Sequence, residues 1–88
     1  MDTRTSLLEN MLDALDRLFD RETSTVDVCA LTYATLHALG TDSLAPVFKT
    51  ASVSLRHLLR EKLPSSNETE RALDITNELR LALAEAIP

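Results

Sequence analysis

Cysteine and long apolar runs are scarce in this sequence, and each scarcity excludes a class of protein. The 88 residues contain one cysteine, Cys29, which has no second thiol for an internal disulfide and so favours a reducing compartment. The first residues read Met-Asp-Thr-Arg and lack the apolar core of a signal peptide, and no segment is apolar enough to cross a bilayer. We therefore expect a cytoplasmic protein with no membrane-embedded part.

Signals for β-strands are also missing. The chain has a single glycine and no sustained alternation of apolar and polar residues. Turn signals divide it into four segments, and each has the apolar spacing of a helix. A chain of this size buries only about 60–65% of the surface it exposes when unfolded, which leaves little room for a catalytic cavity. We expect one all-α domain, residues 1–88, folded as a compact four-helix bundle.

Positively charged residues are fewer than negatively charged ones. The sequence has 9 lysines and arginines and 14 aspartates and glutamates, which gives a net charge of −5. Phosphates of nucleic acid and anionic lipid headgroups would be repelled by such a surface, whereas a basic protein would be steered onto it. The charge is uneven along the chain: residues 1–48 sum to −5, residues 49–63 to +3 and residues 64–88 to −3. We expect a basic protein partner, with no nucleic acid and no membrane.

The first helix is predicted to open with a capping box formed by Ser6 and Glu9. Its buried stripe is expected to contain six apolar residues: Leu8, Met11, Leu12, Leu15, Leu18 and Phe19. A break over residues 20–23 is followed by Ser24, which is a good N-cap for a second helix that ends at Gly40.

The second helix is unusual because Asp27 is its only formal charge between residues 25 and 39. Apolar residues fall on both of its sides, with Val26, Cys29, Tyr33 and Leu36 on one and Val28, Leu31 and Leu39 on the other. This pattern predicts a helix covered on two faces. Either it is the central helix of the bundle, or part of it forms a homodimer contact.

The last two helices are predicted from their capping residues and from the residues on each face. The third is predicted to follow a cap at Asp42 or Ser43, and its outer face is basic through Lys49, Arg56 and Arg60. The fourth is predicted to start with a capping pair of Asn67 and Glu70. Its expected core residues are Ala72, Ile75, Leu79, Ala82, Leu83 and Ala86.

Two acidic helix faces are the candidate partner-binding surfaces. The first helix offers Glu9, Asp13, Asp16 and Asp20, and the last offers Glu68, Glu70, Asp74, Asn77, Glu78 and Leu81. Carboxylates four residues apart repel one another, and those near a helix C-terminus oppose its dipole, so stability alone does not explain them. A solvated face is the alternative explanation. We rank the two faces equally.

Catalytic and metal-binding arrangements are nearly absent. Cys29, Tyr33 and His37 lie about one helical turn apart on a face that is expected to be buried, so a thiolate and an imidazole could pair as nucleophile and base. No electropositive surroundings would lower the pKa of the thiol. Cys29, His37 and His57 lack the spacing of metal ligands. We expect no enzyme, no metal and no cofactor.

The string Leu39-Gly40-Thr41-Asp42-Ser43-Leu44 is similar to the Asp-Ser-Leu signature of acyl carrier proteins, which are small acidic helical bundles. That resemblance implies phosphopantetheine on Ser43 and a recognition helix directly after it. The recognition helix of the family is acidic, whereas the helix that follows Ser43 is basic. Helix capping by Asp42 or Ser43 explains the same string. A carrier protein is therefore the alternative hypothesis to the function described next.

A longer stretch, from about Leu15 to Pro46, resembles the immunity proteins that neutralise colicin D and related contact-dependent tRNA-cleaving toxins. The similar features are the Leu18-Phe19 helix end, the run Glu22-Thr23-Ser24-Thr25-Val26-Asp27, and Gly40-x-x-Ser43-Leu44-Ala45-Pro46. The resemblance implies a small cytoplasmic inhibitor whose carboxylates occupy the basic active site of the toxin. The corresponding part of the third helix is basic here, so the two acidic faces named above are the candidates for that role. We expect an immunity protein for a basic toxin domain, with a carrier protein or a helical homodimeric adaptor as alternatives.

Overall fold

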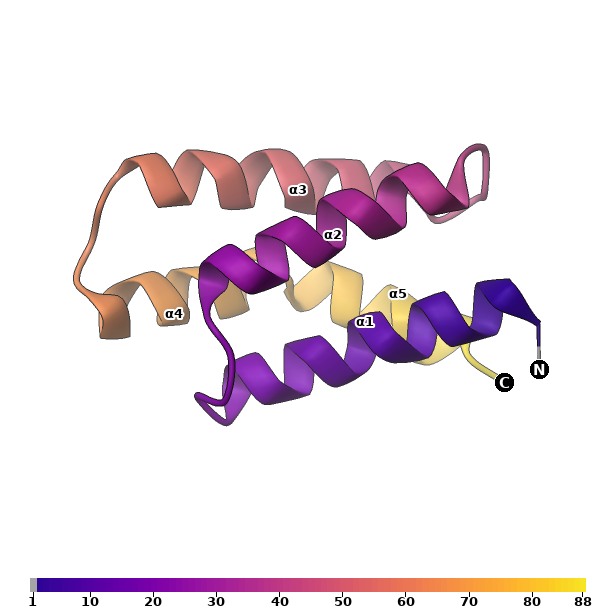
Figure 1. Cartoon of the computed structure of the whole chain (residues 1–88), viewed down its shortest axis with the longest axis horizontal. Coiled ribbons are helices and arrows are strands. Elements are labelled where there is room, and N and C mark those ends of the chain that lie inside the picture. The colour runs from indigo at the N-terminus through magenta and orange to yellow at the C-terminus, as the bar shows by residue number, and fades with distance from the viewer. Residues whose placement is uncertain (1) are drawn as a thin grey trace.

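The computed structural model describes residues 2–88 and consists of five α-helices. They are α1 (Thr3–Phe19), α2 (Thr25–Leu39), α3 (Ala45–Arg60), α4 (Ser65–Ile75) and α5 (Asn77–Ala86), as Figure 1 shows. Residues 2–88 contain no β-strand, and the molecule measures 38 × 23 × 17 Å. The all-α prediction is confirmed, but the number of helices is five rather than four.

The extra helix arises because the predicted fourth helix is broken at Thr76. Successive helices α1, α2 and α3 alternate in direction, and α4 and α5 follow one another along the path expected for a single fourth helix (Figure 1). The Thr76 hydroxyl is buried and donates to the carbonyl oxygen of Ala72 at 2.8 Å. A threonine hydroxyl that bonds four residues back competes with the helical backbone and bends it. Thr76 is thus the residue between α4 and α5, although the buried Thr32 makes the same bond to Val28 without breaking α2.

Three helix ends show how local chemistry sets the boundaries. Asp2 caps α1 by accepting from the Thr5 amide at 2.6 Å, so the helix starts at Thr3 and the predicted capping box of Ser6 and Glu9 is wrong. Ser24 caps α2, as predicted, by accepting from the Asp27 amide at 3.2 Å. Gly40 ends α2 with a φ of +61°, which confirms the need for glycine there.

The turn before α3 is organised by Asp42, although not as the predicted cap. Leu44 is the N-cap residue of α3 and makes no side-chain capping bond. Asp42 instead accepts from the Leu44 amide at 3.0 Å and pairs with Arg4 of α1 at 2.5 Å. The Arg4 guanidinium and the Leu44 amide hold the pKa of the Asp42 carboxyl below its ordinary value. This carboxylate therefore links the start of α1 to the α2–α3 turn.

The start of α4 also differs from the prediction. The helix begins at Ser65, directly after Pro64, and no side chain caps it. The predicted capping pair of Asn67 and Glu70 thus lies inside the helix. Proline suits the position before the first turn because the amides there have no partner within the helix.

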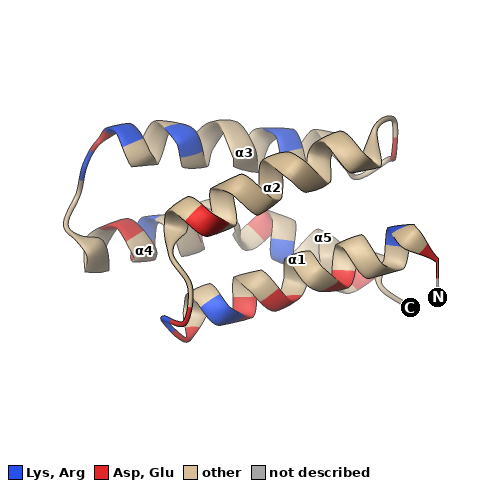
Figure 2. Cartoon of the chain, viewed as in Figure 1, with Lys and Arg blue, Asp and Glu red and all other residues tan. Residues whose placement is uncertain are grey.

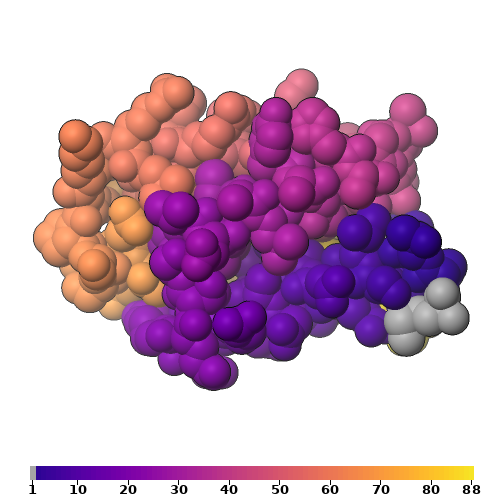
Figure 3. Space-filling model, in the orientation of Figure 1, coloured from indigo at the N-terminus to yellow at the C-terminus, as the bar shows by residue number. Residues whose placement is uncertain are grey.

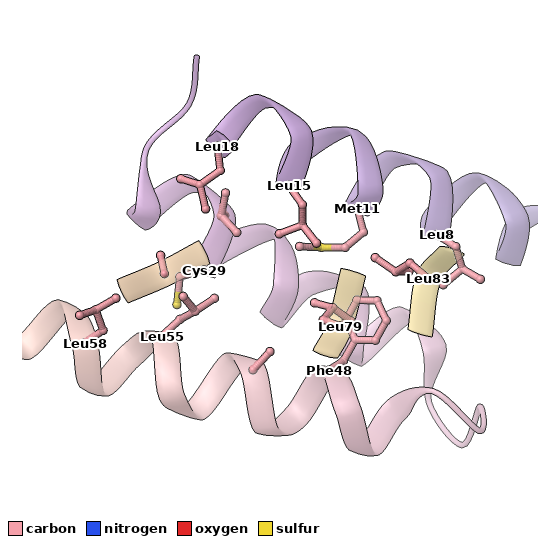
Figure 4. Packing of buried hydrophobic residues seen from close by; sticks show 13 residues of the cluster. Leu8, Met11, Leu15, Leu18, Cys29, Phe48, Leu55, Leu58, Leu79 and Leu83 are labelled. Carbon is pink, nitrogen blue, oxygen red and sulfur yellow. The ribbon is translucent and has the colours of Figure 1, made fainter. Parts of the chain in front are cut away.

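The core lies between all five helices (Figure 4). Its thirteen buried hydrophobic residues are Leu8, Met11, Leu15, Leu18, Val28, Cys29, Phe48, Ala51, Leu55, Leu58, Ala72, Leu79 and Leu83. The predicted stripe of α1 is confirmed except at Phe19, whose side chain is 66% exposed. Phe19 is turned about 100° around the helix from the buried Leu18, and it ends α1 where no other helix covers it.

Helix α2 is covered on one face only within one copy of the chain, so the alternative that it is the central helix of the bundle is wrong. Val28 and Cys29 are buried, whereas Val26 and Tyr33 are 57% and 48% exposed. Thr32, rather than a further apolar residue, fills the inner face and is fully buried. Its hydroxyl can be buried because it donates to the Val28 carbonyl oxygen at 2.7 Å.

Candidate protein-binding groove

An open groove of about 440 Å³ lies between the end of α1 and the junction of α4 and α5. Its lining comes from all three helices and consists of Asp16, Phe19, Leu73, Asp74, Asn77 and Arg80. We call this feature the acidic groove, because two of its three charged side chains are carboxylates. Its lining includes Asp16 from the first of the two acidic helix faces predicted from the sequence, and Asp74 and Asn77 from the second.

The packing of α1 against α4 and α5 positions these side chains. Arg80 of α5 donates to the Asp16 carboxylate of α1 at 2.6 Å, across 64 residues of sequence. Both side chains are partly exposed, at 34% for Arg80 and 55% for Asp16, and exposed ion pairs contribute little to stability. The pair therefore leaves the second carboxylate, Asp74, as the unneutralised charge of the groove lining.

The groove also contains apolar surface. Phe19 is the most exposed large hydrophobic residue of the described chain, and Leu73 beside it is half-buried. An exposed aromatic ring next to carboxylates can pack on an apolar side chain or on the face of an arginine or lysine cation. Interfaces commonly concentrate their binding energy on such aromatic anchors.

The remaining predicted residues lie around this groove or away from it. Glu9 and Asp13 are exposed along the same face of α1 as Asp16, Asp20 is exposed directly after the end of that helix, and Figure 2 shows the acidic residues along α1. Glu70 is exposed and lines a neighbouring hollow of about 390 Å³ that shares Asp74 with the acidic groove. Those carboxylates extend the acidic surface on both sides of the groove.

Seven of the ten predicted residues are not part of the lining: Glu9, Asp13, Asp20 and Glu70, described above, and Glu68, Glu78 and Leu81. Glu78 and Leu81 are exposed on α5 outside it, with Leu81 58% exposed. Glu68 is half-buried and lines a separate hollow near the start of α4. The ten predicted residues therefore do not form one compact site, and Asp16, Asp74 and Asn77 are those brought together.

Sequence reasoning missed Phe19, Leu73 and Arg80. The sequence positions of Phe19 and Leu73 could have indicated that they lie off the buried stripe. Each directly follows a buried residue, Leu18 or Ala72, and so is turned away from the centre of that stripe. Arg80 gave no such signal, since its pairing with Asp16 depends on how two distant helices pack. Its presence reduces the net negative charge of the groove.

The other candidate residues lie on different faces. Ser43 is exposed in the turn that precedes α3. Lys49, Arg56 and Arg60 are exposed on α3, and Figure 2 shows basic residues along that helix. The basic surface is thus separate from the acidic groove.

The cysteine and histidine that were weighed as a nucleophile and base are in unlike environments. Cys29 is only 7% exposed, and burial raises the pKa of its thiol. Tyr33 and His37 are exposed, with ring centroids 4.4 Å apart in an edge-to-face arrangement. The expectation that all three share a buried face is therefore wrong for Tyr33 and His37. A thiol in this state is mostly protonated at neutral pH.

No protein-family model, curated protein or solved structure matches this chain. Within residues 2–88, no group of three or more histidine, cysteine, aspartate or glutamate side chains is arranged to hold a metal ion. None of the helices in the described part of the chain has both the length and the apolar character needed to span a bilayer.

Proposed function

We propose that this protein binds and inhibits a basic partner, specifically the nuclease domain of a bacterial toxin, and that the acidic groove is the centre of its docking surface. One observation supports this proposal above the others. One carboxylate from each acidic helix face, Asp16 and Asp74, which are far apart in the sequence, lines a groove that contains an exposed aromatic ring.

The chemistry of a nuclease active site explains why such a surface would inhibit it. Nucleases hold phosphates with lysine, arginine and histidine side chains, so carboxylates on a rigid helical element can take the place of the phosphates. Asp74 and the row of carboxylates on α1 would face those cations, and Phe19 would supply the apolar anchor. The inhibitor acts by blocking the site and is not turned over.

Charge also predicts how the two proteins would meet. With a net charge of −5, the protein attracts a basic partner over a distance of about one Debye length, roughly 8–10 Å at physiological salt. Association should be fast and should slow as the salt concentration rises. The basic face of α3 would be repelled by the same partner, so it should stay outside the interface.

The proposal is tested by purifying the protein at low salt from the organism that encodes it and examining the complex by native mass spectrometry. We expect a basic partner that salt releases. The released partner should cleave RNA or DNA, and one equivalent of this protein should stop the cleavage. A partner without nuclease activity, or a nuclease whose rate is unchanged by the protein, would contradict the proposal.

A carrier protein is the second candidate function, and the exposure of Ser43 before α3 is the observation that favours it. Its hydroxyl is accessible for attachment of a phosphopantetheine arm. The same mass spectrum separates the two functions, because a covalent increment that is absent from Ser43→Ala would indicate a carrier. The exposed Val26 and Tyr33 on α2 leave a homodimeric adaptor as a third candidate, which would give an unmodified dimer in that spectrum.

A further inference from the structure

The acidic groove has one carboxylate that is open to a ligand. Arg80 holds Asp16 at 2.6 Å, whereas Asp74 is exposed and makes no ion pair within residues 2–88. The charged side chains of the lining are two carboxylates and one guanidinium, so its formal charge is −1. One singly charged cation would neutralise the groove.

An aromatic ring lines the same groove and selects the same kind of ligand independently of these charges. The Phe19 side chain is 66% exposed, and the half-buried Leu73 lies in the same lining. In Figure 3 the purple surface around the end of α1 adjoins the orange surface of α4, which packs against it. The face of an aromatic ring attracts cations, and leucine can pack on an aliphatic stem. Ring and carboxylate together therefore suit a cation carried on an apolar stem, which is the chemistry of lysine and arginine side chains.

The polar acceptors of the groove favour arginine over lysine. Besides the Asp74 carboxylate, the lining contains Asn77, the exposed first residue of α5, whose side-chain amide oxygen can accept a hydrogen bond. A guanidinium is planar and has five N–H donors in a fixed fork, so it can stack on a ring and donate to two acceptors at once. A lysine ammonium is a strongly hydrated point charge that gains less from such a surface.

Arg80 does not prevent a second guanidinium from entering the groove. Its own guanidinium donates to Asp16, so the repulsion that it exerts on an incoming cation is largely offset by that carboxylate. The same pair keeps Asp16 occupied. Asp74 is therefore the carboxylate that an arginine from outside would meet.

We infer that the acidic groove binds one arginine side chain of a protein partner, with the guanidinium between the Phe19 ring and the Asp74 carboxylate. This inference rests on the proposed function for the identity of the partner as a basic protein, and it adds the chemical group by which the partner is recognised. The groove, of about 440 Å³, is within the size range of small-molecule sites and is open to a side chain that projects from another protein.

The test is a titration of the full chain with N-acetyl-arginine methylamide, which carries the arginine side chain without the charges of a free amino acid. Backbone and side-chain amide signals are followed by nuclear magnetic resonance at constant ionic strength. We expect saturable shifts at Phe19, Asp74 and Asn77. The matched ligand is N-acetyl-citrulline methylamide, which has nearly the same shape and no charge, and it should give no saturable shifts. N-acetyl-lysine methylamide should bind more weakly than the arginine ligand.

Two exposed positions can be changed without altering the core. Phe19→Leu keeps an apolar side chain but removes the ring, and it should weaken arginine binding about two- to fivefold. Asp74→Asn removes the charge and should weaken it by a similar factor, about two- to fivefold. The matched controls are Tyr33→Leu and Asp27→Asn, which make the same kinds of change at exposed positions of α2. Both controls should bind the arginine ligand as tightly as the wild type.

Three results would overturn the inference. One is a set of shifts that do not saturate or that the citrulline ligand reproduces. Another is binding of the lysine ligand as tight as that of the arginine ligand. The third is unchanged affinity in both Phe19→Leu and Asp74→Asn.

Failure of this inference can be told apart from failure of the proposed function, because the titration needs no toxin. A co-purified nuclease that is inhibited by a protein without a saturable arginine site would refute the inference alone. Saturable arginine binding that both groove variants weaken supports the inference, even where the co-purified partner proves not to be a nuclease.

Discussion

Ser52 provides a stability prediction whose size can be worked out from the structure. It lies within α3, is 1% exposed, and its hydroxyl oxygen has no hydrogen-bond partner among residues 2–88. Leaving a buried hydroxyl without a partner costs about 1–3 kcal/mol. Replacing serine by alanine inside a helix adds up to about 0.5 kcal/mol of helix propensity. The lost contacts of one oxygen atom offset part of this sum, so Ser52→Ala should raise the free energy of unfolding by about 1–2 kcal/mol.

Urea unfolding followed by circular dichroism measures this change directly, with the melting temperature as a second readout. For a domain of this size each kcal/mol should raise the melting temperature by about 4–8 °C. Ser54→Ala is the matched control, because Ser54 is in the same helix but only half-buried, and it should give the propensity gain alone. A Ser52→Ala protein that is no more stable than the wild type, or no more stable than Ser54→Ala, would refute the reasoning.

Three further predictions concern stability and reactivity. Asp42→Asn should lower the free energy of unfolding at neutral pH, and this loss should shrink in acid. Arg4 holds the pKa of the Asp42 carboxyl below its ordinary value of 3.8, so the stabilisation is present above that value and is lost as the pH falls through the folded pKa. Urea unfolding at neutral and acidic pH measures this, and a loss of stability that does not change with pH would contradict it. Gly40→Ala should lower the free energy of unfolding by about 1–2 kcal/mol through backbone strain alone, because φ is +61° and no atom lies within 4 Å of the added Cβ. An unchanged urea midpoint would argue against that strain. Cys29 should react slowly with an aromatic disulfide reagent in the native protein and quickly after unfolding, and equal rates would show that its thiol is accessible.

Much of the fold could be predicted because the relevant signals are local. Ser24 and Gly40 mark helix ends through properties of single residues, and the apolar spacing of α1 identifies its buried side apart from Phe19. The break at Thr76 could not be predicted in the same way. A threonine is compatible with a helix interior, as the buried Thr32 inside α2 shows, so the residue type alone does not mark a helix end.

The candidate site was predicted as two separate faces because helical spacing identifies the residues on one face of one helix. Whether two faces meet depends on how α1 packs against α4 and α5. Asp16 and Arg80 illustrate this, since their pairing across 64 residues decides which carboxylate of the groove is neutralised. The exposure of Phe19 is of the same kind, because it depends on where the neighbouring helices end.

The most direct test of the acidic groove is the dissociation constant of the co-purified basic partner, measured by calorimetry at low salt. The groove variant is Asp16→Lys with Asp74→Lys, and the matched control is Asp27→Lys with Glu61→Lys, which makes the same charge change at exposed positions outside the groove lining. We predict that the groove variant raises the dissociation constant at least about tenfold, equivalent to about 1.4 kcal/mol, and that the control changes it much less. Equal effects of the two variants would show that net charge alone attracts the partner, and would contradict the assignment of the groove as the docking surface.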